Sequence, residues 1–403
     1  MPGRHPRLAL AIIALVVGLA GLAGTPPIDR DEPQFAQPAR QMLASGDLVD
    51  IRFQSAPLAQ KPILTYWLEA ASAALFGGPE HARIWAYRLP SVLAILVAAL
   101  LTFRLAAILF GIGTALPAAL LLTASLLVQT QAHQARADAL LLAEMAAVAV
   151  PLARAHLAGS AHAYPREAAL AAMFWIGLAA SILTKGPVVP AIILPAAAAL
   201  AWVRRDARWL GHLRARWGVP LLLLLLVPWP AAVIWRSGPS LFVQAWQSDI
   251  FPKMISGQES HGAPPLSYLA TSPLTLWPAS LFLPAAVEYA WRRRRDAAVV
   301  FCASVIIPGW LLFEAAPTKL PHYIMPFLPL LAALMAASCF SPAGDEPSRA
   351  ARRVGAIFLL AGAACVSGAI ALSLLRLGPG LGVAAAAWIA GLAATAAYGA
   401  VVA

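Results

Sequence analysis

Three carboxylates lie within four residues directly after the first apolar segment, in the run Asp29-Arg30-Asp31-Glu32. Carboxylates this close together repel one another, which raises their pKa values. Such a cluster can supply a general base or bind a metal ion. The structural alternative is a helix cap, because acids favour a helix N-terminus and Pro33 suits its first turn. Residues 34–44 have the pattern of a helix.

The lysines form a second group of candidate functional residues. The chain has 29 Lys and Arg residues, but only Lys61, Lys185, Lys253 and Lys319 are lysines. All four fall in segments that we place on the outer side of a membrane. Lysine is a compact charge that suits phosphate, and its stem can reach into a cleft. The alternative is that they are interface residues whose stems extend toward lipid headgroups.

Polar residues also flank two further apolar segments. Arg136 and Asp138 lie at a turn, where ionisable residues are costly unless they are paired or functional. The run Thr318-Lys319-Leu320-Pro321-His322-Tyr323 opens another segment. At a membrane surface its Lys, His and Tyr side chains can contact an anionic headgroup or anchor the helix.

Glu259 and His261 lie in a polar stretch, Ser256-Gly257-Gln258-Glu259-Ser260-His261-Gly262. They can ligate a divalent metal ion, but two ligands at this spacing also occur in plain loops. The chain contains no P-loop, Rossmann glycine pattern, Gly-x-Ser-x-Gly elbow or His-Glu-x-x-His sequence. Nucleotide-driven chemistry is therefore not indicated.

The elements that position these residues are apolar helices. Of the 403 residues 61% are hydrophobic and 12% are charged, whereas about 45–50% apolar is usual for soluble domains. A spanning helix needs roughly 20 residues. The sequence predicts an all-α polytopic membrane protein of about twelve transmembrane helices. Their ranges are 8–24, 89–110, 115–131, 138–157, 168–183, 188–203, 217–235, 266–290, 297–313, 322–340, 354–375 and 382–402.

The charges follow this topology when both termini are placed in the cytoplasm. The inner side then holds 17 of the 29 basic residues and seven of the 18 acids, with Glu144 counted among those acids. The net charge of +11 thus belongs to short inner segments, as the positive-inside rule expects. A nucleic-acid partner is not predicted, because a basic binding patch needs no such alternation.

The domain prediction is a single transmembrane domain over 1–403. Outer loops at 25–88 and 236–265 form the roof of the site, and the first carries short amphipathic helices. No separate soluble C-terminal domain is expected. Loops on a rigid helical scaffold are where chemistry tends to lie.

Taken in order, these groups resemble the polyprenyl-phosphate-dependent glycosyltransferases of the GT-C superfamily. The chain is similar to the bacterial lipid A aminoarabinose transferases and the protein O-mannosyltransferases. The segments that carry the resemblance are Asp31-Glu32, 39–47 (ARQMLASGD), Lys61-Pro62, Tyr66-Trp67, 88–91 (RLPS), 136–141 (RADALL), 183–187 (LTKGP), Ser256-Gly257, His261-Gly262 and 318–323 (TKLPHY).

The resemblance implies a GT-C-like fold and an inverting transfer of a sugar from a polyprenyl (undecaprenyl) phosphate at the periplasmic face of a bacterial inner membrane. The acceptor is a lipid, a glycan or a protein. The Asp-Glu pair then becomes the catalytic pair, with Asp31 as the general base beside Glu32. Lys61 contacts the donor phosphate. The cations expected to help it are Arg88, Lys185 and Lys319, and the residues expected to bind substrate are Arg136, Asp138, His261, His322 and Tyr323.

Three departures from the family pattern limit what the resemblance implies. Gln60 stands where the family often has Glu before the lysine of Lys-Pro. A divalent metal ion is therefore not firmly predicted, and Glu259 and His261 are its only candidate ligands. Phe35 replaces a usual Tyr, which loses a hydroxyl group, and Ala263-Pro264-Pro265-Leu266 replaces the usual aromatic pattern after His-Gly.

Two other functions compete with glycosyl transfer. A secondary transporter or lipid flippase fits twelve spans and charges at the membrane edge. Against it, the charges gather on the outer face and no repeated half is visible. A non-catalytic assembly partner is the third reading, which replacement of Asp31 without any effect would support.

Overall fold

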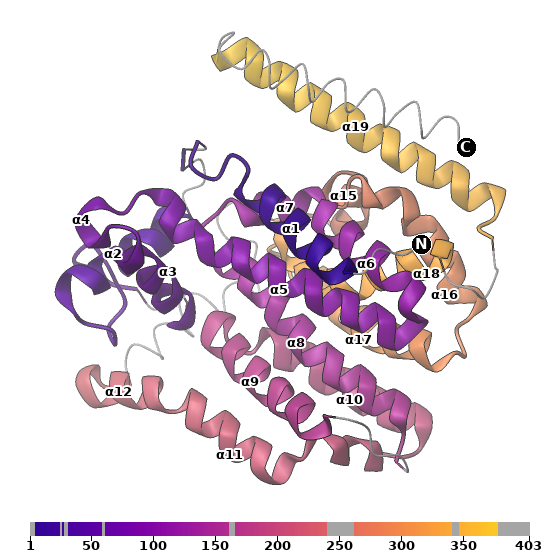
Figure 1. The fold of residues 1–403 in the computed structure, drawn as a ribbon, viewed down its shortest axis with the longest axis horizontal. Coiled ribbons are helices and arrows are strands. Elements are labelled where there is room, and N and C mark those ends of the chain that lie inside the picture. The colour runs from indigo at the N-terminus through magenta and orange to yellow at the C-terminus, as the bar shows by residue number, and fades with distance from the viewer. Residues whose placement is uncertain are drawn as a thin grey trace.

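The computed structural model describes residues 5–24, 26–27, 31–58, 61–160, 166–239, 262–340 and 346–377. These residues form helices of very different lengths, together with one short hairpin (Figure 1). The α-helices are α1 (Pro6–Leu19), α2 (Pro33–Ser45), α3 (Leu64–Leu75), α4 (Gly78–His81), α5 (Ile84–Phe110), α6 (Ile112–Ala124), α7 (Leu126–Ala132), α8 (Ala137–Ala158), α9 (Glu167–Lys185), α10 (Val188–Arg204), α11 (Ala215–Leu226), α12 (Pro228–Ser237), α15 (Ser267–Thr275), α16 (Leu283–Arg292), α17 (Ala297–Ala315), α18 (Leu328–Phe340) and α19 (Arg349–Leu377). The 3₁₀ helices are η1 (Arg208–Leu213), η3 (Ala279–Phe282) and η4 (Pro321–Phe327), and the strands are β1 (Arg52–Phe53) and β2 (Ala56–Pro57).

Seven helical segments are long and apolar enough to cross a membrane, or eight if the bent pair α6 and α7 is one span. The shorter apolar helices α1 and α10 match two more of the predicted segments. The all-α membrane architecture is confirmed for the described residues. The count of twelve stays a prediction, and the last predicted segment, 382–402, lies outside the described residues.

Two predicted spans are not single straight helices. The segment 115–131 bends by 63° between α6 and α7. The bend is held by tertiary structure, since the N–H of Leu126 donates a hydrogen bond to the carbonyl of Trp277. The segment 266–290 is divided into α15, η3 and α16, and Pro273 and Pro278 lie in this stretch, where they remove backbone donors.

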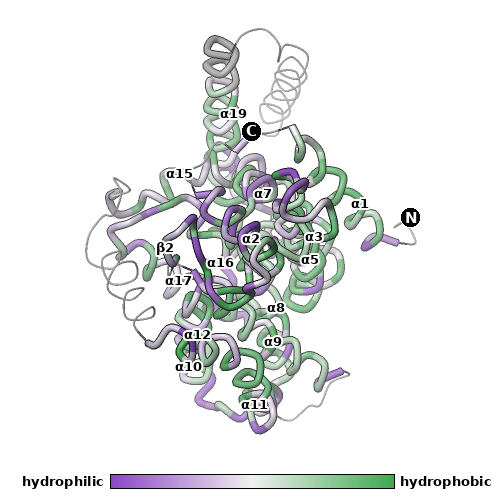
Figure 2. The backbone as a smooth tube through the Cα atoms, turned by 90° about the vertical axis from the view of Figure 1, so that its left-hand side faces the viewer, coloured by the Kyte–Doolittle hydropathy of each residue, from purple (hydrophilic) through white to green (hydrophobic). Residues whose placement is uncertain are grey.

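The centre of the bundle is built from α5, α8 and α18. Helix α5 packs against α6, α8 and α18, and α8 also packs against α9. Many buried residues on these helices are alanines, including Ala98, Ala146 and Ala336. Small side chains let helix backbones approach closely in a membrane, where packing rather than water exclusion holds helices together. Figure 2 shows the largely apolar colouring of α5 and α8.

The predicted loop 25–88 folds into α2, the β1–β2 hairpin, α3 and α4 at one end of the molecule (Figure 1). The predicted helix at 34–44 is confirmed as α2. It begins at Pro33 and ends at Ser45, and Gly46 directly after it has a φ of 73°, the left-handed conformation that terminates many helices. Helix α2 packs on α3, and α3 packs on α5 and α9. These contacts fix the residues just before α2 against the ends of the central helices.

Candidate active site

Asp31 lies immediately before α2, and its side chain is 33% exposed. Its Oδ2 accepts a hydrogen bond of 2.9 Å from Nη2 of Arg136, the residue that precedes α8. Asp31 is therefore held in one orientation and still remains accessible from solvent. This combination suits a carboxylate that accepts a proton from a bound substrate.

Glu32, the next residue, is buried against Arg88 of α5. Arg88 donates two hydrogen bonds to the carboxylate, of 2.6 and 2.8 Å, and a third of 3.0 Å to the carbonyl of Leu22. The backbone N–H of Ala135 donates another to Glu32 Oε1 at 3.0 Å. Both side chains of the pair are 1% exposed. Glu32 thus joins the start of α2 to α5 and to the turn before α8, and it makes no side-chain cap on α2.

A buried charged network surrounds Asp138 at the start of α8. Nζ of Lys185, from the end of α9, makes a short contact with Asp138 Oδ1. Nε of Arg136 lies 3.8 Å and Nε2 of His322 lies 3.7 Å from Asp138 Oδ2. The Asp138, Arg136 and His322 side chains are all less than 9% exposed. The structure therefore brings four predicted substrate or phosphate residues into one cluster.

The cluster is continuous with Asp31 and with Tyr323. Nη2 of Arg136, which bonds Asp31, also lies 3.3 Å from Nε2 of His322. Nζ of Lys185 lies 5.1 Å from the centre of the Tyr323 ring, within the range of a cation–π contact. Residues from α8, α9, η4 and the segment before α2 thus form one connected polar region. We refer to Asp31, Arg136, Asp138, Lys185, His322 and Tyr323 as the outer cluster.

Two other predicted phosphate-binding lysines take different positions. Lys61 lies three residues before α3 and is half-buried. Lys319 is buried, and its Nζ donates hydrogen bonds to the carbonyls of Ala316 at 2.8 Å and Ala263 at 3.1 Å. These two bonds join the segment that begins at Gly262 to the segment before η4, beside the bridge between Gly262 and Thr318.

Two buried acids were not singled out from the sequence. Glu69 of α3 is 1% exposed, and burial and the negative charge of Glu32 raise its pKa well above the ordinary value for Glu. Glu144 of α8 accepts a hydrogen bond of 2.6 Å from Thr184 Oγ1. The sequence offered one signal for Glu144, which is an acidic residue within an apolar helix. Such residues are rare in membrane-spanning segments and are usually functional.

The candidate metal ligands Glu259 and His261 lie outside the described residues, as does Gln60. Among the residues that the structure does describe, no group of three or more His, Cys, Asp or Glu side chains is arranged to hold a metal ion.

Sequence comparison relates the chain to two groups of glycosyltransferases. The family described as dolichyl-phosphate-mannose-protein mannosyltransferase matches residues 60–235. An undecaprenyl phosphate-alpha-4-amino-4-deoxy-L-arabinose arabinosyl transferase of Pseudomonas aeruginosa is 33% identical over 312 residues, which cover 76% of this chain and 54% of that protein. The enzyme of the same name from Edwardsiella ictaluri is 30% identical over 366 residues, covering 88% and 62%. The chain therefore spans somewhat more than half the length of these relatives.

Solved structures show the same fold. ArnT from Cupriavidus metallidurans, in a crystal structure with undecaprenyl phosphate bound, matches with a TM-score of 0.77 and 24% identity, covering 92% of this chain and 66% of that one. The oligosaccharyltransferase AglB from Archaeoglobus fulgidus matches with a TM-score of 0.56 and 12% identity, over 88% of this chain and 54% of that one.

The helical bundle has the fold of solved membrane glycosyltransferases, and the predicted resemblance to the GT-C glycosyltransferases is confirmed. Within that class the chain is similar in sequence to the undecaprenyl-phosphate aminoarabinose transferases.

Proposed function

We propose that the chain transfers a glycosyl group from a polyprenyl-phosphate donor to a lipid, glycan or protein acceptor at the periplasmic face of a bacterial inner membrane. The observation that carries this proposal is the accessible carboxylate of Asp31, held at 2.9 Å by Arg136 at the edge of a buried cluster of cations. The relatives are named for transfer from undecaprenyl phosphate, so a sugar on that carrier is the proposed donor.

Asp31 acts as the general base in this proposal. It takes the proton of an acceptor hydroxyl group while the acceptor oxygen attacks the anomeric carbon of the sugar. The bond between that carbon and the phosphate oxygen breaks, and the phosphate leaves with the polyprenyl chain. A phosphate monoester is a good leaving group that needs charge stabilisation more than a proton. One direct displacement inverts the anomeric configuration.

Cations from the outer cluster stabilise the departing phosphate. Arg136 and Lys185 contact the carboxylates of Asp31 and Asp138 in the structure. A bound phosphate would share these cations, and Lys61 supplies a further charge from the segment before α3. Arg and Lys are the residues that best hold phosphate oxygens in this way.

Three of the residues expected to act directly, Glu32, Arg88 and Lys319, have indirect roles in this proposal. Glu32 and Arg88 satisfy each other in the interior, so the pair positions Asp31 by fixing the residue next to it. Lys319 holds the segment after Gly262 through two carbonyl groups. His322 and Tyr323 remain the proposed substrate contacts from η4.

The test is a transfer assay with purified protein in detergent. A panel of undecaprenyl-phosphate sugars is supplied with candidate acceptors, without any ion gradient. We expect release of undecaprenyl phosphate and a glycosylated product with inverted anomeric configuration, identified by NMR. A transporter or flippase would move a donor across vesicles and leave its glycosidic bond intact, so that result would contradict the proposal.

A further inference from the structure

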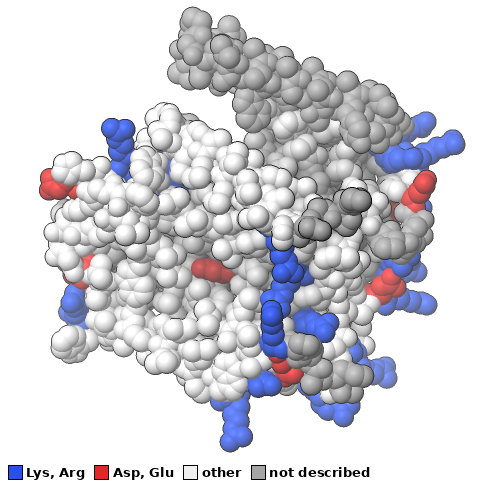
Figure 3. All heavy atoms as spheres, viewed as in Figure 1, with Lys and Arg blue, Asp and Glu red and all other residues white. Residues whose placement is uncertain are grey.

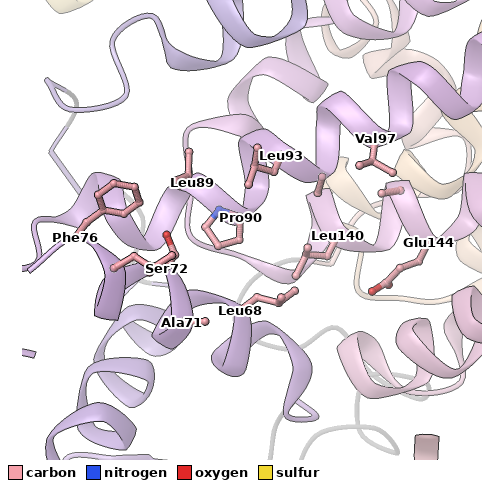
Figure 4. Close-up of a pocket in the computed structure, with 13 residues that line it drawn as sticks. Leu68, Ala71, Ser72, Phe76, Leu89, Pro90, Leu93, Val97, Leu140 and Glu144 are labelled. Atoms are coloured by element: carbon pink, nitrogen blue, oxygen red, sulfur yellow. The ribbon is translucent and has the colours of Figure 1, made fainter. Parts of the chain in front are cut away.

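A cavity of about 410 Å³ lies between α3, α5 and α8 (Figure 4). Its walls are almost wholly apolar, with Leu68 and Leu75 from α3 and Leu93 and Val97 from α5. Figure 4 shows Phe76 and Ser72 at one end of the cavity and Val97 and Glu144 at the other. None of the outer-cluster residues lines it, so it is separate from the site described above.

The cavity is accessible from the lipid side of the bundle. Leu75 is 80% exposed, and Leu93 and Val97 on the spanning helix α5 are 47% and 46% exposed. Apolar side chains exposed on a spanning helix face hydrocarbon rather than water. The face of the molecule in Figure 3 is mostly uncharged, apart from an acidic side chain near its middle and Lys and Arg atoms that are most numerous on the half away from α2–α4. An occupant of the cavity therefore enters from the bilayer and has an apolar chain.

The cavity differs from a purely apolar groove because its lining includes the carboxyl group of Glu144. Glu144 lies six residues beyond Asp138 on α8, about 9 Å along the helix axis, and the residue is 9% exposed. Thr184 satisfies its Oε1, but its Oε2 has no hydrogen-bond partner among the described residues. The sequence analysis placed Glu144 among the acids on the inner side of the membrane. The structure corrects that placement, because Glu144 lies within the spanning helix α8.

Among the side chains that line the cavity, Glu144 carries the buried oxygen atom that lacks a hydrogen-bond partner among the described residues. Ser72, the other polar residue of the lining, already donates a hydrogen bond of 2.6 Å to the carbonyl of Ala86. A buried polar atom without a hydrogen-bond partner destabilises the structure that holds it. A polyprenyl chain carries no polar group along its length, so it would leave Glu144 Oε2 unsatisfied. A chain with a hydroxyl or amide group at the right depth would satisfy it.

We propose that this cavity binds one acyl chain of a membrane lipid, and that Glu144 forms a hydrogen bond with a hydroxyl or amide group carried within that chain. Thr184 fixes the carboxyl group for this contact. The next residue along α9 is Lys185 of the outer cluster, so the lipid would lie directly beneath the proposed active site. The proposal goes beyond glycosyl transfer and does not depend on it.

The test measures displacement of a photo-crosslinking stearoyl probe from the purified protein. The competitors are stearic acid, a series of hydroxystearic acids that differ in hydroxyl position, and undecaprenyl phosphate. We expect one hydroxystearic acid to bind about three- to tenfold more tightly than stearic acid, the effect of a single hydrogen bond. Glu144→Leu should abolish this preference, whereas Glu144→Gln, which keeps hydrogen-bonding atoms, should retain it.

Two further variants separate the cavity from the rest of the membrane surface. Ala71→Trp places a large side chain at the exposed cavity wall on α3 and should reduce probe labelling severalfold. Leu194→Trp, at an exposed position on α10, should leave labelling unchanged. Asp31→Asn should be labelled by the stearoyl probe as strongly as wild type. Lipid binding in the cavity can therefore be tested independently of the proposed glycosyl transfer. Equal affinity for every acid in wild type and Glu144→Leu would overturn the proposal, as would stronger displacement by undecaprenyl phosphate than by any acid.

Discussion

At the residue scale, the site depends on pairs of opposite charges that burial makes sensitive to single changes. Glu32 and Arg88 are the clearest case, because both side chains are 1% exposed and are joined by two hydrogen bonds. Removing one partner of a buried pair leaves an uncompensated charge, which typically costs about 3–5 kcal/mol. Removing both charges is far less harmful, since neither group then has to be buried alone.

We therefore expect Arg88→Met to lower the free energy of unfolding by about 3–5 kcal/mol. The double variant Glu32→Gln with Arg88→Met should recover most of that loss. Thermal unfolding of the purified protein in detergent, followed by tryptophan fluorescence, measures both. Equal destabilisation of the single and double variants would show that the pair is not what holds this region.

The second residue-scale prediction concerns pH and Glu69. The pKa of Glu in an unfolded chain is about 4.3, whereas burial and the charge of Glu32 raise the pKa of folded Glu69 well above that value. The folded state then binds more protons than the unfolded state above pH 4.3, so stability falls as pH rises through this window. We expect Glu69→Gln, which cannot titrate, to gain stability relative to wild type between about pH 5 and pH 8.

The measurement is the unfolding temperature of wild type and Glu69→Gln across that pH range. Glu80→Gln, a change at an exposed Glu on α4, is the matched control and should follow wild type at every pH. A constant difference between Glu69→Gln and wild type would contradict the assigned pKa shift.

At the scale of elements, helix packing depends on small residues at specific contacts. Gly218 near the start of α11 is an example, since an added Cβ would lie 1.9 Å from Nε1 of Trp175 on α9. That indole nitrogen already donates a hydrogen bond of 2.6 Å to the carbonyl of Leu213. An alanine here must displace Trp175 and disturb the packing of α9 against α11.

We expect Gly218→Ala to destabilise the protein by about 1–3 kcal/mol, the usual cost of overpacking. Gly211→Ala is the matched control, because nothing lies within 4 Å of its added Cβ. That change should stay within about 0.5 kcal/mol of wild type. Unfolding temperatures in detergent test this prediction. Equal values for the two variants would show that Trp175 moves aside without lowering the stability of the protein.

An element can be predicted from the sequence when the residues that determine it lie within it or directly beside it. Helix α2 was predicted because Pro33 and the apolar spacing after it are local signals. The bend between α6 and α7 was not, because it is held by a hydrogen bond from Leu126 to Trp277, which is distant in the sequence.

The site follows the same rule. Residue types and order selected Asp31, Arg136 and Asp138 as candidates, but they did not show that Glu32 pairs with a residue 56 positions away and Asp138 with one 47 positions away. Such pairs arise only when the helices pack, so a single sequence does not reveal them. Glu32 and Arg88 were consequently expected to act on substrate, whereas the structure places them in the interior.

At the scale of the whole molecule, the charge distribution predicts which end faces which compartment. The segment with α2–α4 is expected outside, and the basic stretch around Arg292–Arg295 is expected inside. We expect Ser55→Cys to be labelled by an impermeant thiol reagent from the outside and Ala350→Cys only after the membrane is opened. The background for this experiment has Cys339 and Cys365 replaced, since both are exposed. The opposite labelling pattern would reverse the proposed topology.

The most direct test of the central claim is the turnover of Asp31→Asn in the transfer assay with an undecaprenyl-phosphate sugar. Loss of a general base typically costs about 10²–10⁴-fold, so we expect turnover to fall at least a hundredfold while the protein stays folded. Asp296→Asn is the matched control, because Asp296 also pairs with an arginine, Arg293 at 3.3 Å, far from the outer cluster in sequence. Its turnover should match wild type. If Asp31→Asn retains wild-type turnover, Asp31 is not the base and the proposed mechanism is wrong.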